Sequence, residues 1–242
     1  MNKKPFILLF SLMFFLISGK MHSGKLINES DSILAKEKEM LEQMTTMIWD
    51  NMGGMKHGLK KEVLLLAING YLRLNQEGSL QSGKPLTIID FDLPSTDKRM
   101  WVIDMETYTL KFNSLVAHGK NSGHLHAKNF SNQPESHMSS LGFYLTGETY
   151  LGKHGNSLRL DGLEHGINDQ ARSRAIVIHA AAYAEKKFIK NFGRLGRSLG
   201  CPALPKENYE EIIRIIKDKS LIFVHSNQGN YKRESVFLNG RV

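Results

Sequence analysis

The chain contains little cysteine and no long apolar segment, and both shortages limit what it can be. Its 242 residues include one cysteine, six prolines and two tryptophans. A single cysteine excludes an intramolecular disulfide and the paired-cysteine patterns of structural zinc sites. The hydrophobic content of 41% is too high for a disordered chain. The composition is that of a globular protein with room for one or two cores.

The longest apolar run lies near the N-terminus, at residues 6–17, and Lys3 and Lys4 precede it. At about 1.5 Å per residue, a helix of this length falls well short of the roughly 30 Å hydrocarbon core of a bilayer. The pattern predicts a secretory signal peptide over residues 1–19, and therefore export to the periplasm or cell envelope. The alternative is an uncleaved membrane anchor through residues 5–18, because no clean small-residue cleavage site is visible.

The chain is moderately basic, with 32 lysines and arginines against 24 acidic residues and a net charge of +8. Loss of residues 1–19 would remove two lysines and no acid, leaving +6. This charge suits contact with an anionic envelope polymer, or simply solubility. The charges are scattered, so we expect no nucleic-acid partner, and no obligate protein partner is indicated.

Periodicity divides the chain into a helical N-terminal part and a longer β-rich part. Residues 25–80 form a helical segment and linker, with apolar residues at helical spacing in 25–57 and again in 60–74. Gly70 lowers the helix propensity of the second stretch. Residues 76–85 are rich in Gly, Ser and Gln, which is typical of a linker.

The β-rich part, residues 86–226, consists of short runs of β-branched and aromatic residues separated by turn residues. Most of this region should be antiparallel sheet, with a hairpin turn at residues 106–108. A helix is expected after Pro205, which suits a first helical position. Residues 227–242 should be an exposed C-terminal tail. The expected strands are 86–91, 100–105, 109–117, 143–146, 157–160, 175–180 and 221–225.

Cys201 is the first candidate for chemistry. In an oxidising compartment an unpaired cysteine is either an intermolecular bridge or a free reactive thiol. Its segment, residues 193–205, is rich in glycine, and Arg194 and Arg197 would favour a thiolate. A buried, inert cysteine is the alternative, which Gly, Arg and Ser neighbours explain poorly.

A thiol nucleophile needs a base, and His179 is the best candidate by position. It ends the apolar run 175–178 and three alanines follow it, so a strand would carry the imidazole to a sheet edge beside small residues. The alternative is a structural histidine with no catalytic partner.

Motifs of other site classes are missing. His124 and His126 would share one face of a strand near His118, but no third ligand motif accompanies them, so we expect no metal and no cofactor. No G-x-S-x-G elbow or phosphate-binding loop is present. Acidic residues such as Asp161 and Glu164 stand in no arrangement that singles out a glycosidase pair.

Two stretches together resemble the catalytic core of the L,D-transpeptidases, which act on bacterial peptidoglycan. They are residues 174–179 (RAIVIH) and 196–203 (GRSLGCPA), in the branch whose cysteine motif reads S-x-G-C-P-A. Upstream segments also match, and the likeness covers residues 86–226. The order of histidine before cysteine is opposite to that of papain-like peptidases. The matching upstream segments are 116–119 (VAHG), 139–143 (SSLGF), 147–152 (GETYLG) and 160–163 (LDGL).

The resemblance implies a mainly β (α+β) fold: an L,D-transpeptidase-like antiparallel β-sandwich with a few peripheral helices and an N-terminal helical segment. It implies Cys201 as nucleophile and His179 as its base, with Ser198 and Gly200 shaping the loop. Backbone N–H groups near Gly200 and Cys201 would form the oxyanion hole. Leu199 replaces the second histidine of better-known members, and Pro202 lacks an N–H to donate.

The implied substrate is the peptidoglycan stem peptide, cleaved with release of D-alanine and transferred to an amine through a thioester. Hydrolysis of the same stems and a non-catalytic envelope-binding module are the alternatives. The guanidinium forks of arginines can pair with stem carboxylates, and histidines in polar loops can contact substrate. The residues expected to bind substrate are Arg174, Arg194, Arg197, His118 and His154.

Overall fold

The structure is a computed structural model that describes residues 23–153 and 155–239. Residues 1–19, the predicted signal peptide or anchor, lie outside this range. The chain divides into two compact units between Met40 and Leu41. Among the helices described, none is both long and apolar enough to cross a membrane.

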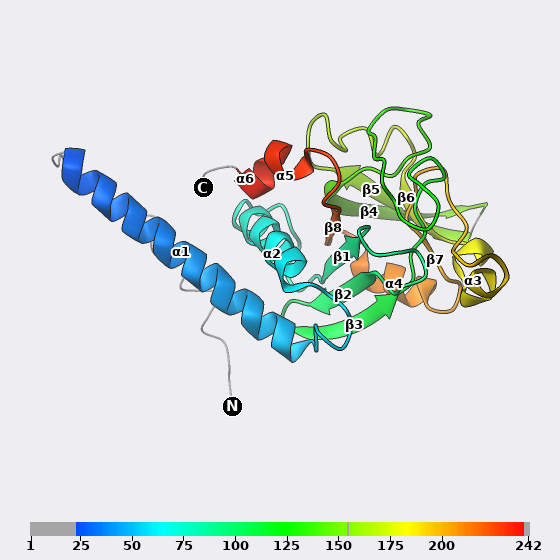
Figure 1. Cartoon of the computed structure of the whole chain (residues 1–242), viewed down its shortest axis with the longest axis horizontal. Coiled ribbons are helices and arrows are strands. Elements are labelled where there is room, and N and C mark those ends of the chain that lie inside the picture. The colour runs from blue at the N-terminus through cyan, green and yellow to red at the C-terminus, as the bar shows by residue number, and fades with distance from the viewer. Residues whose placement is uncertain (1–22, 154, 240–242) are drawn as a thin grey trace. The chain divides into compact units, whose positions relative to one another are not determined.

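Two helices form where the N-terminal periodicity predicts them: α1 (Ser23–Asn51) and α2 (Lys61–Gln76). The end of α1 belongs to the second unit, where Ile48 is fully buried. The indole N–H of Trp49 donates to the Leu59 carbonyl oxygen at 2.8 Å and fixes the turn between the helices. Helix α2 buries an apolar face that packs against the central strands β1 (Leu86–Asp90) and β8 (Leu221–His225) (Figure 1).

Gly70 in α2 is required by packing. A Cβ at this position would overlap the ring of Phe143, which is fully buried on β4 (Gly142–Gly152). The glycine that weakens the helix therefore lets α2 approach the sheet closely.

Replacing Gly70 with alanine is expected to lower the free energy of unfolding in urea by up to about 2 kcal/mol. The overlap with Phe143 costs about 1–3 kcal/mol and outweighs the helix-propensity gain of about 1 kcal/mol. Asn75→Ala, at an exposed position of the same helix, serves as the matched control and should leave stability unchanged or slightly higher. A Gly70→Ala variant more stable than the wild type would contradict the close approach.

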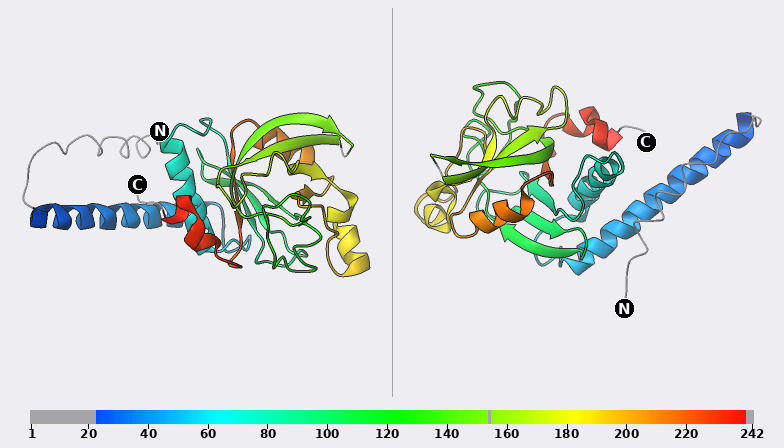
Figure 2. Two further views of the ribbon diagram at one scale, coloured as in Figure 1. Left: turned by 90° about the horizontal axis from the view of Figure 1, so that it is seen from above. Right: turned by 180° about the vertical axis from the view of Figure 1, so that it is seen from behind.

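Eight strands follow one another in the order β3-β2-β1-β8-β4-β5-β6-β7. Every expected strand is present, and the predicted turn joins β2 to β3 as an antiparallel hairpin. The β4–β5 hairpin is the longest, and Figure 2 shows its two curved strands. The fold class is confirmed as mainly β with peripheral helices. The remaining strands are β2 (Met100–Asp104), β3 (Thr109–Ser114), β5 (Gly155–Gly162), β6 (Val177–Ala180) and β7 (Ala203–Leu204).

The sheet departs from an all-antiparallel arrangement at two places, because β1 pairs with β8 and β6 pairs with β7 in parallel. Its two ends also approach each other. Ala117, after edge strand β3, forms an antiparallel bridge with Ala203 of β7, the strand at the opposite end of the order. The strands therefore nearly close on themselves, and the closure lies beside the cysteine segment.

Short helices flank the sheet. Between β6 and β7 lie the 3-10 turn η1 (Ala182–Ala184) and α3 (Lys186–Phe192), neither of which was predicted. The helix expected after Pro205 is α4, but its bounds are Tyr209–Ile216. Pro205 therefore precedes the helix rather than starting it, since Asn208 is the N-cap.

The expectation of an exposed tail after Ser226 is wrong. Helices α5 (Tyr231–Glu234) and α6 (Val236–Asn239) follow, and α6 packs against α2. The Tyr231 and Ser235 hydroxyls donate to the carboxylate of Glu164, which is buried. Phe237 lies edge-on to Phe143 with ring centroids 5.4 Å apart. The C-terminal segment therefore covers part of the core.

Candidate active site

Cys201 lies at the end of a tight turn built by Ser198 and Gly200. The Ser198 hydroxyl donates to the Cys201 carbonyl oxygen at 2.6 Å and accepts the Gly200 N–H at 3.1 Å. Gly200 has a φ of 125°, a backbone conformation that favours glycine. A Cβ there would lie 2.9 Å from both the Met138 carbonyl oxygen and the Ile176 Cδ1. Both residues predicted to shape the loop thus hold the turn by specific contacts.

Cys201 is partly exposed as a residue, and its sulfur lies against the start of β6. The Val177 N–H donates to Sγ at 3.5 Å, and the thiol in turn donates to the Ala175 carbonyl oxygen at 3.7 Å. Burial raises the pKa of the Cys201 thiol, although the Val177 N–H and the Arg174 charge lower it in part. The thiol is therefore largely protonated at neutral pH and needs a base.

His179 occupies the strand next to the cysteine segment. It lies opposite Ala203 in the parallel β6–β7 pair, while Val177, two residues earlier, contacts Sγ. His179 is 5% exposed, and its Nδ1 lies 2.9 Å from the Ala180 carbonyl oxygen. A carbonyl can only accept, so Nδ1 carries the proton and the lone pair of the neutral ring is on Nε2. This tautomer suits a general base.

Hydrogen bonds within the turn reduce the number of N–H groups that are available for the predicted oxyanion hole. The Gly200 N–H already donates to Ser198 Oγ, so it is engaged within the turn. The Cys201 N–H lies close enough to its own sulfur to lower the thiol pKa. This leaves the Cys201 N–H as the stronger of the two predicted donors to an oxyanion.

Ser139 is a positioning residue that the sequence interpretation did not single out. Its hydroxyl donates to the Gly200 carbonyl oxygen at 3.1 Å and accepts the Gly119 N–H at 3.1 Å. Its own N–H donates to Ser122 Oγ at 2.9 Å. The turn that carries Cys201 is thereby joined to the loop after β3. Ser139 stands in one of the segments that carried the family resemblance, which was the available signal.

His118 is a second residue behind the turn, and it does not contact solvent. Its side chain has no exposed surface, so the substrate contact predicted for it is not supported. The Arg99 guanidinium, also fully buried, donates to His118 Nδ1 at 2.8 Å and to the Val116 carbonyl oxygen. Burial and the Arg99 charge lower the pKa of His118 to about 3. The His118 carbonyl oxygen accepts the Ser198 N–H at 2.9 Å, so this neutral histidine supports the cysteine turn.

Arg174 also stabilises the site, through hydrogen bonds to the loop that contains Ser131 and Met138. Its guanidinium donates to the carbonyl oxygens of Ser131 and Met138, each at 2.7 Å, and to the Ser136 hydroxyl at 3.2 Å. These contacts occupy both terminal nitrogens. Arg174, rather than Arg194 or Arg197, is the arginine whose charge acts on the Cys201 thiol.

Arg194 and Arg197 flank the cysteine segment and are half-buried. Arg194 donates to the Leu195 carbonyl oxygen at 2.7 Å. Arg197 donates to the Lys120 carbonyl oxygen at 3.0 Å and so ties the cysteine segment to the loop after β3. Their contacts with substrate stay predictions.

Tyr183 is an aromatic residue that interacts electrostatically with the Cys201 thiol. It belongs to η1, and burial together with the Cys201 charge raises its pKa to about 12. Gly196 packs so closely against it that a Cβ would overlap the Tyr183 side chain. Tyr183 therefore lies within electrostatic reach of the thiol and stays neutral at physiological pH.

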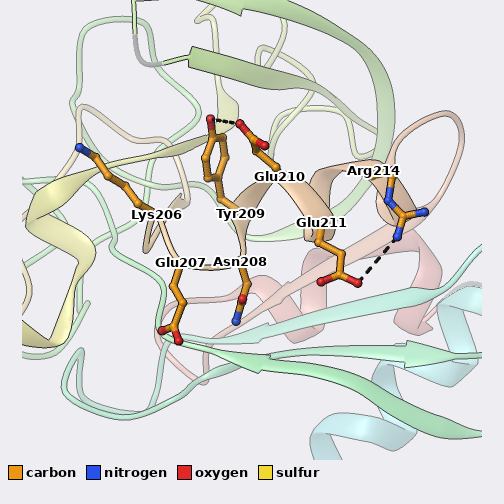
Figure 3. Close-up of a pocket in the computed structure, with 7 residues that line it drawn as sticks. All are labelled: Lys206, Glu207, Asn208, Tyr209, Glu210, Glu211 and Arg214. Carbon is orange, nitrogen blue, oxygen red and sulfur yellow. Dashed lines mark hydrogen bonds and ion pairs between the residues drawn. The ribbon is translucent and has the colours of Figure 1, made fainter.

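His124 and His126 do not assemble around the thiol. His124 and His126 are exposed and lie in a loop rather than a strand. His154 lies outside the described residues. A surface hollow at the start of α4 is lined by residues 206–211 and Arg214, where Tyr209 donates to Glu210 and Arg214 pairs with Glu211 (Figure 3). It contains neither Cys201 nor His179.

The turn, the thiol and the histidine strand fall within a single matched region. Residues 55–225 match the family described as L,D-transpeptidase catalytic domain. The chain belongs to this family. The comparison with curated proteins found no match.

Solved L,D-transpeptidases are similar in structure at low sequence identity. One from Mycobacterium smegmatis has a TM-score of 0.37 at 12% identity, with 59% of each chain covered. One from Stackebrandtia nassauensis has a TM-score of 0.35 at 14% identity, covering 75% of this chain and 76% of that one. The helical cell shape determining protein of Campylobacter jejuni has a TM-score of 0.41 at 14% identity, covering 68% and 57%. The chain thus spans about three fifths of the mycobacterial protein, 59%.

The raised pKa of the thiol gives a direct expectation for its reactivity. Alkylation of Cys201 by iodoacetamide should accelerate with pH, with a midpoint above about 8.5, the ordinary value for a cysteine. Arg174→Met should move the midpoint higher still, because the arginine charge favours the thiolate. Arg197→Met, which removes an arginine that does not act on the thiol, is the matched control. A midpoint near neutrality in the wild type would show that the resting enzyme holds a thiolate instead.

Proposed function

We propose that this chain is an exported cysteine L,D-transpeptidase that acts on peptidoglycan stem peptides through a thioester on Cys201. The proposal rests on one observation: the turn that holds Cys201 lies beside the strand that carries His179. The thiol lies in a fixed turn against the N–H of Val177, and the same strand bears His179 two residues later, with its proton on Nδ1. Family membership supplies the reaction class.

The first half-reaction transfers the acyl group to sulfur. His179 takes the thiol proton, and the Cys201 sulfur attacks the carbonyl that joins the L-centre of the stem diamino acid to terminal D-alanine. The Cys201 N–H stabilises the oxyanion of the tetrahedral intermediate. The carbon–nitrogen bond then breaks, and the proton held by His179 goes to the departing amino group of D-alanine.

The second half-reaction returns the free thiol. The amine of a neighbouring stem attacks the thioester, its proton passes to His179, and the sulfur leaves as the new amide forms. The protonated histidine then returns its proton to sulfur. Attack by water in place of the amine gives a shortened stem, which is the carboxypeptidase outcome.

The experiment that tests this proposal is incubation of the full chain with a purified disaccharide tetrapeptide. We expect equimolar release of D-alanine and a cross-linked dimer, both absent in Cys201→Ala. Release of D-alanine without a cross-linked dimer would show that the enzyme hydrolyses the stem instead of transferring it to an amine. If the wild type instead releases no D-alanine and binds peptidoglycan as well as Cys201→Ala does, that result would show that the chain is a non-catalytic envelope-binding module.

Export is proposed from the sequence of residues 1–19. Intact mass of the protein recovered from the envelope fraction tests it, because cleavage near residue 19 removes the N-terminal apolar run. Recovery of the uncleaved chain in the membrane fraction would favour an anchor through residues 5–18, and recovery from the cytoplasm would overturn export.

A further inference from the structure

Away from the thiol, three metal-ligating side chains meet at one end of the central sheet. Asp90 ends β1, His225 ends β8, and the two residues lie opposite each other in the parallel pair. Asp92 follows in the loop after β1. One potential ligand atom of each residue lies within 4.8 Å of the others, and His225 Nε2 is 3.6 Å from Asp92 Oδ2.

Two of the three side chains carry buried polar atoms that lack a partner. Asp90 has no exposed surface and His225 is 1% exposed. Asp90 Oδ2 and His225 Nδ1 make no hydrogen bond, although Asp90 Oδ1 accepts the Asp92 N–H at 3.1 Å. An unpaired carboxylate oxygen is costly in the interior, so such an atom in a folded protein usually contacts a water or an ion. Only one ring nitrogen of His225 can bind the same cation, and Nε2 is the one that lies near Asp92.

The third side chain is held in a fixed orientation at the rim. Asp92 Oδ1 accepts the Ser226 hydroxyl at 2.8 Å and the Asn227 N–H at 2.9 Å. The Asp92 side chain is 15% exposed, which gives an incoming cation access from solvent. Such outer hydrogen bonds are typical of carboxylates that coordinate metals, because they orient the ligand before the metal binds.

Nearby positive charge does not already satisfy the cluster. Arg99 and Lys60 act on Asp90 through space. The Arg99 donors, however, are taken by the carbonyl oxygens of Leu93 and Val116 and by His118. The two carboxylates therefore keep negative charge that is not neutralised by a direct ion pair with this arginine.

We propose that Asp90, Asp92 and His225 bind a divalent cation of the first transition row. Ligands about 2.0–2.2 Å from such a metal lie within about 4.5 Å of one another. The three ligand atoms, all within 4.8 Å of one another, therefore need only a small adjustment to reach one cation. The imidazole favours zinc over calcium and magnesium, which prefer oxygen ligands alone, and the two carboxylates also suit manganese. Sequence spacing could not reveal this set, because His225 is remote from the two aspartates in the chain.

The cation would stabilise the fold by cross-linking two strands and a loop. It joins the ends of β1 and β8 and fixes the segment after β1, whose Leu93 carbonyl oxygen holds Arg99. Arg99 in turn contacts His118, whose carbonyl oxygen accepts the Ser198 N–H of the cysteine turn. The main expected effect of the cation is therefore on stability.

The test is calorimetric titration of the metal-stripped full chain with ZnCl₂ and with MnCl₂, accompanied by thermal unfolding. We expect one cation per chain for at least one of these metals, and a rise in Tm of about 5–10 °C near 100-fold excess over Kd. Cys201→Ala must bind equally well, since the thiol is a competing zinc ligand. Asp90→Asn and His225→Gln should each weaken binding by about 100-fold or more.

Asp92→Asn provides the variant least able to disturb folding, because its side chain is at the rim, and it should also weaken binding. His126→Gln, which removes an exposed histidine, is the matched control and should bind as the wild type does. Absence of stoichiometric binding by the wild type would overturn the proposal. Binding that is undiminished in all three cluster variants, or lost in Cys201→Ala, would overturn it as well.

Discussion

Replacing His179 with glutamine is expected to lower kcat for D-alanine release by about 10²–10⁴-fold, with KM changed by only a few-fold. Burial keeps the Cys201 thiol protonated at neutral pH, so loss of the base leaves little nucleophile. The glutamine removes the ring nitrogen that bears the lone pair without adding charge. Steady-state kinetics on a disaccharide tetrapeptide measure both parameters.

The pH profile separates a base from a merely positioning residue. In His179→Gln the residual rate should keep rising towards alkaline pH, because hydroxide then generates the thiolate. The wild-type rate should level off earlier. Equal fractional loss at every pH would indicate that His179 only positions the turn. His126→Gln, at an exposed histidine outside the site, should retain wild-type kinetics.

The second large effect is expected at Gly200. Replacement by alanine places a Cβ 2.9 Å from the Met138 carbonyl oxygen and from Ile176 Cδ1, at a φ of 125° that disfavours side chains. The turn must shift, and a displacement of about 1 Å at the nucleophile is enough to cost roughly 10²-fold in rate. We therefore expect kcat/KM to fall by about 10²-fold or more.

Gly193→Ala is the matched control for Gly200→Ala. Gly193 also has a positive φ, 68°, but a Cβ there meets nothing within 4 Å. It should lower stability slightly and leave kcat/KM close to the wild-type value. Near-UV circular dichroism checks that both variants are folded. A Gly200→Ala enzyme with full activity would contradict the role of the turn.

Strong local patterns in the sequence were sufficient for most of the fold. The run 175–178 is apolar and mostly β-branched, and His179 follows it, so the strand that carries His179 could be predicted. Helix α3 gave only a weak signal, because its seven residues include three apolar side chains and none is fully buried, although Ile189 packs against a small apolar cluster. Strand β7, with two residues, is too short for any periodicity.

The errors concern residues whose surroundings come from distant segments. Tyr231 and Phe237 are isolated aromatics in a polar tail, and only their contacts with Glu164 and Phe143 bring them into the core. His118 reads as a loop histidine, yet buried Arg99 holds it inside. Burial of a polar side chain depends on the partner it finds, and a local pattern does not contain that information.

The same dependence on distant segments explains why the sequence alone did not distinguish the roles of the three arginines. Arg174, Arg194 and Arg197 are equivalent by composition and proximity to the motif. The fold turns Arg174 towards the carbonyl oxygens of the loop that includes Ser131 and Met138, within electrostatic reach of the thiol. Tertiary packing therefore decides which arginine acts on the Cys201 thiol.

The central claim, that Cys201 is the acylated nucleophile, is tested most directly by intact-mass spectrometry of the full chain quenched during turnover of a disaccharide tetrapeptide. We predict an adduct with the mass of the substrate minus D-alanine, mapped to Cys201 by peptide sequencing and absent in Cys201→Ala. An active wild-type enzyme that never carries this adduct, or an adduct that persists in Cys201→Ala, would contradict the claim.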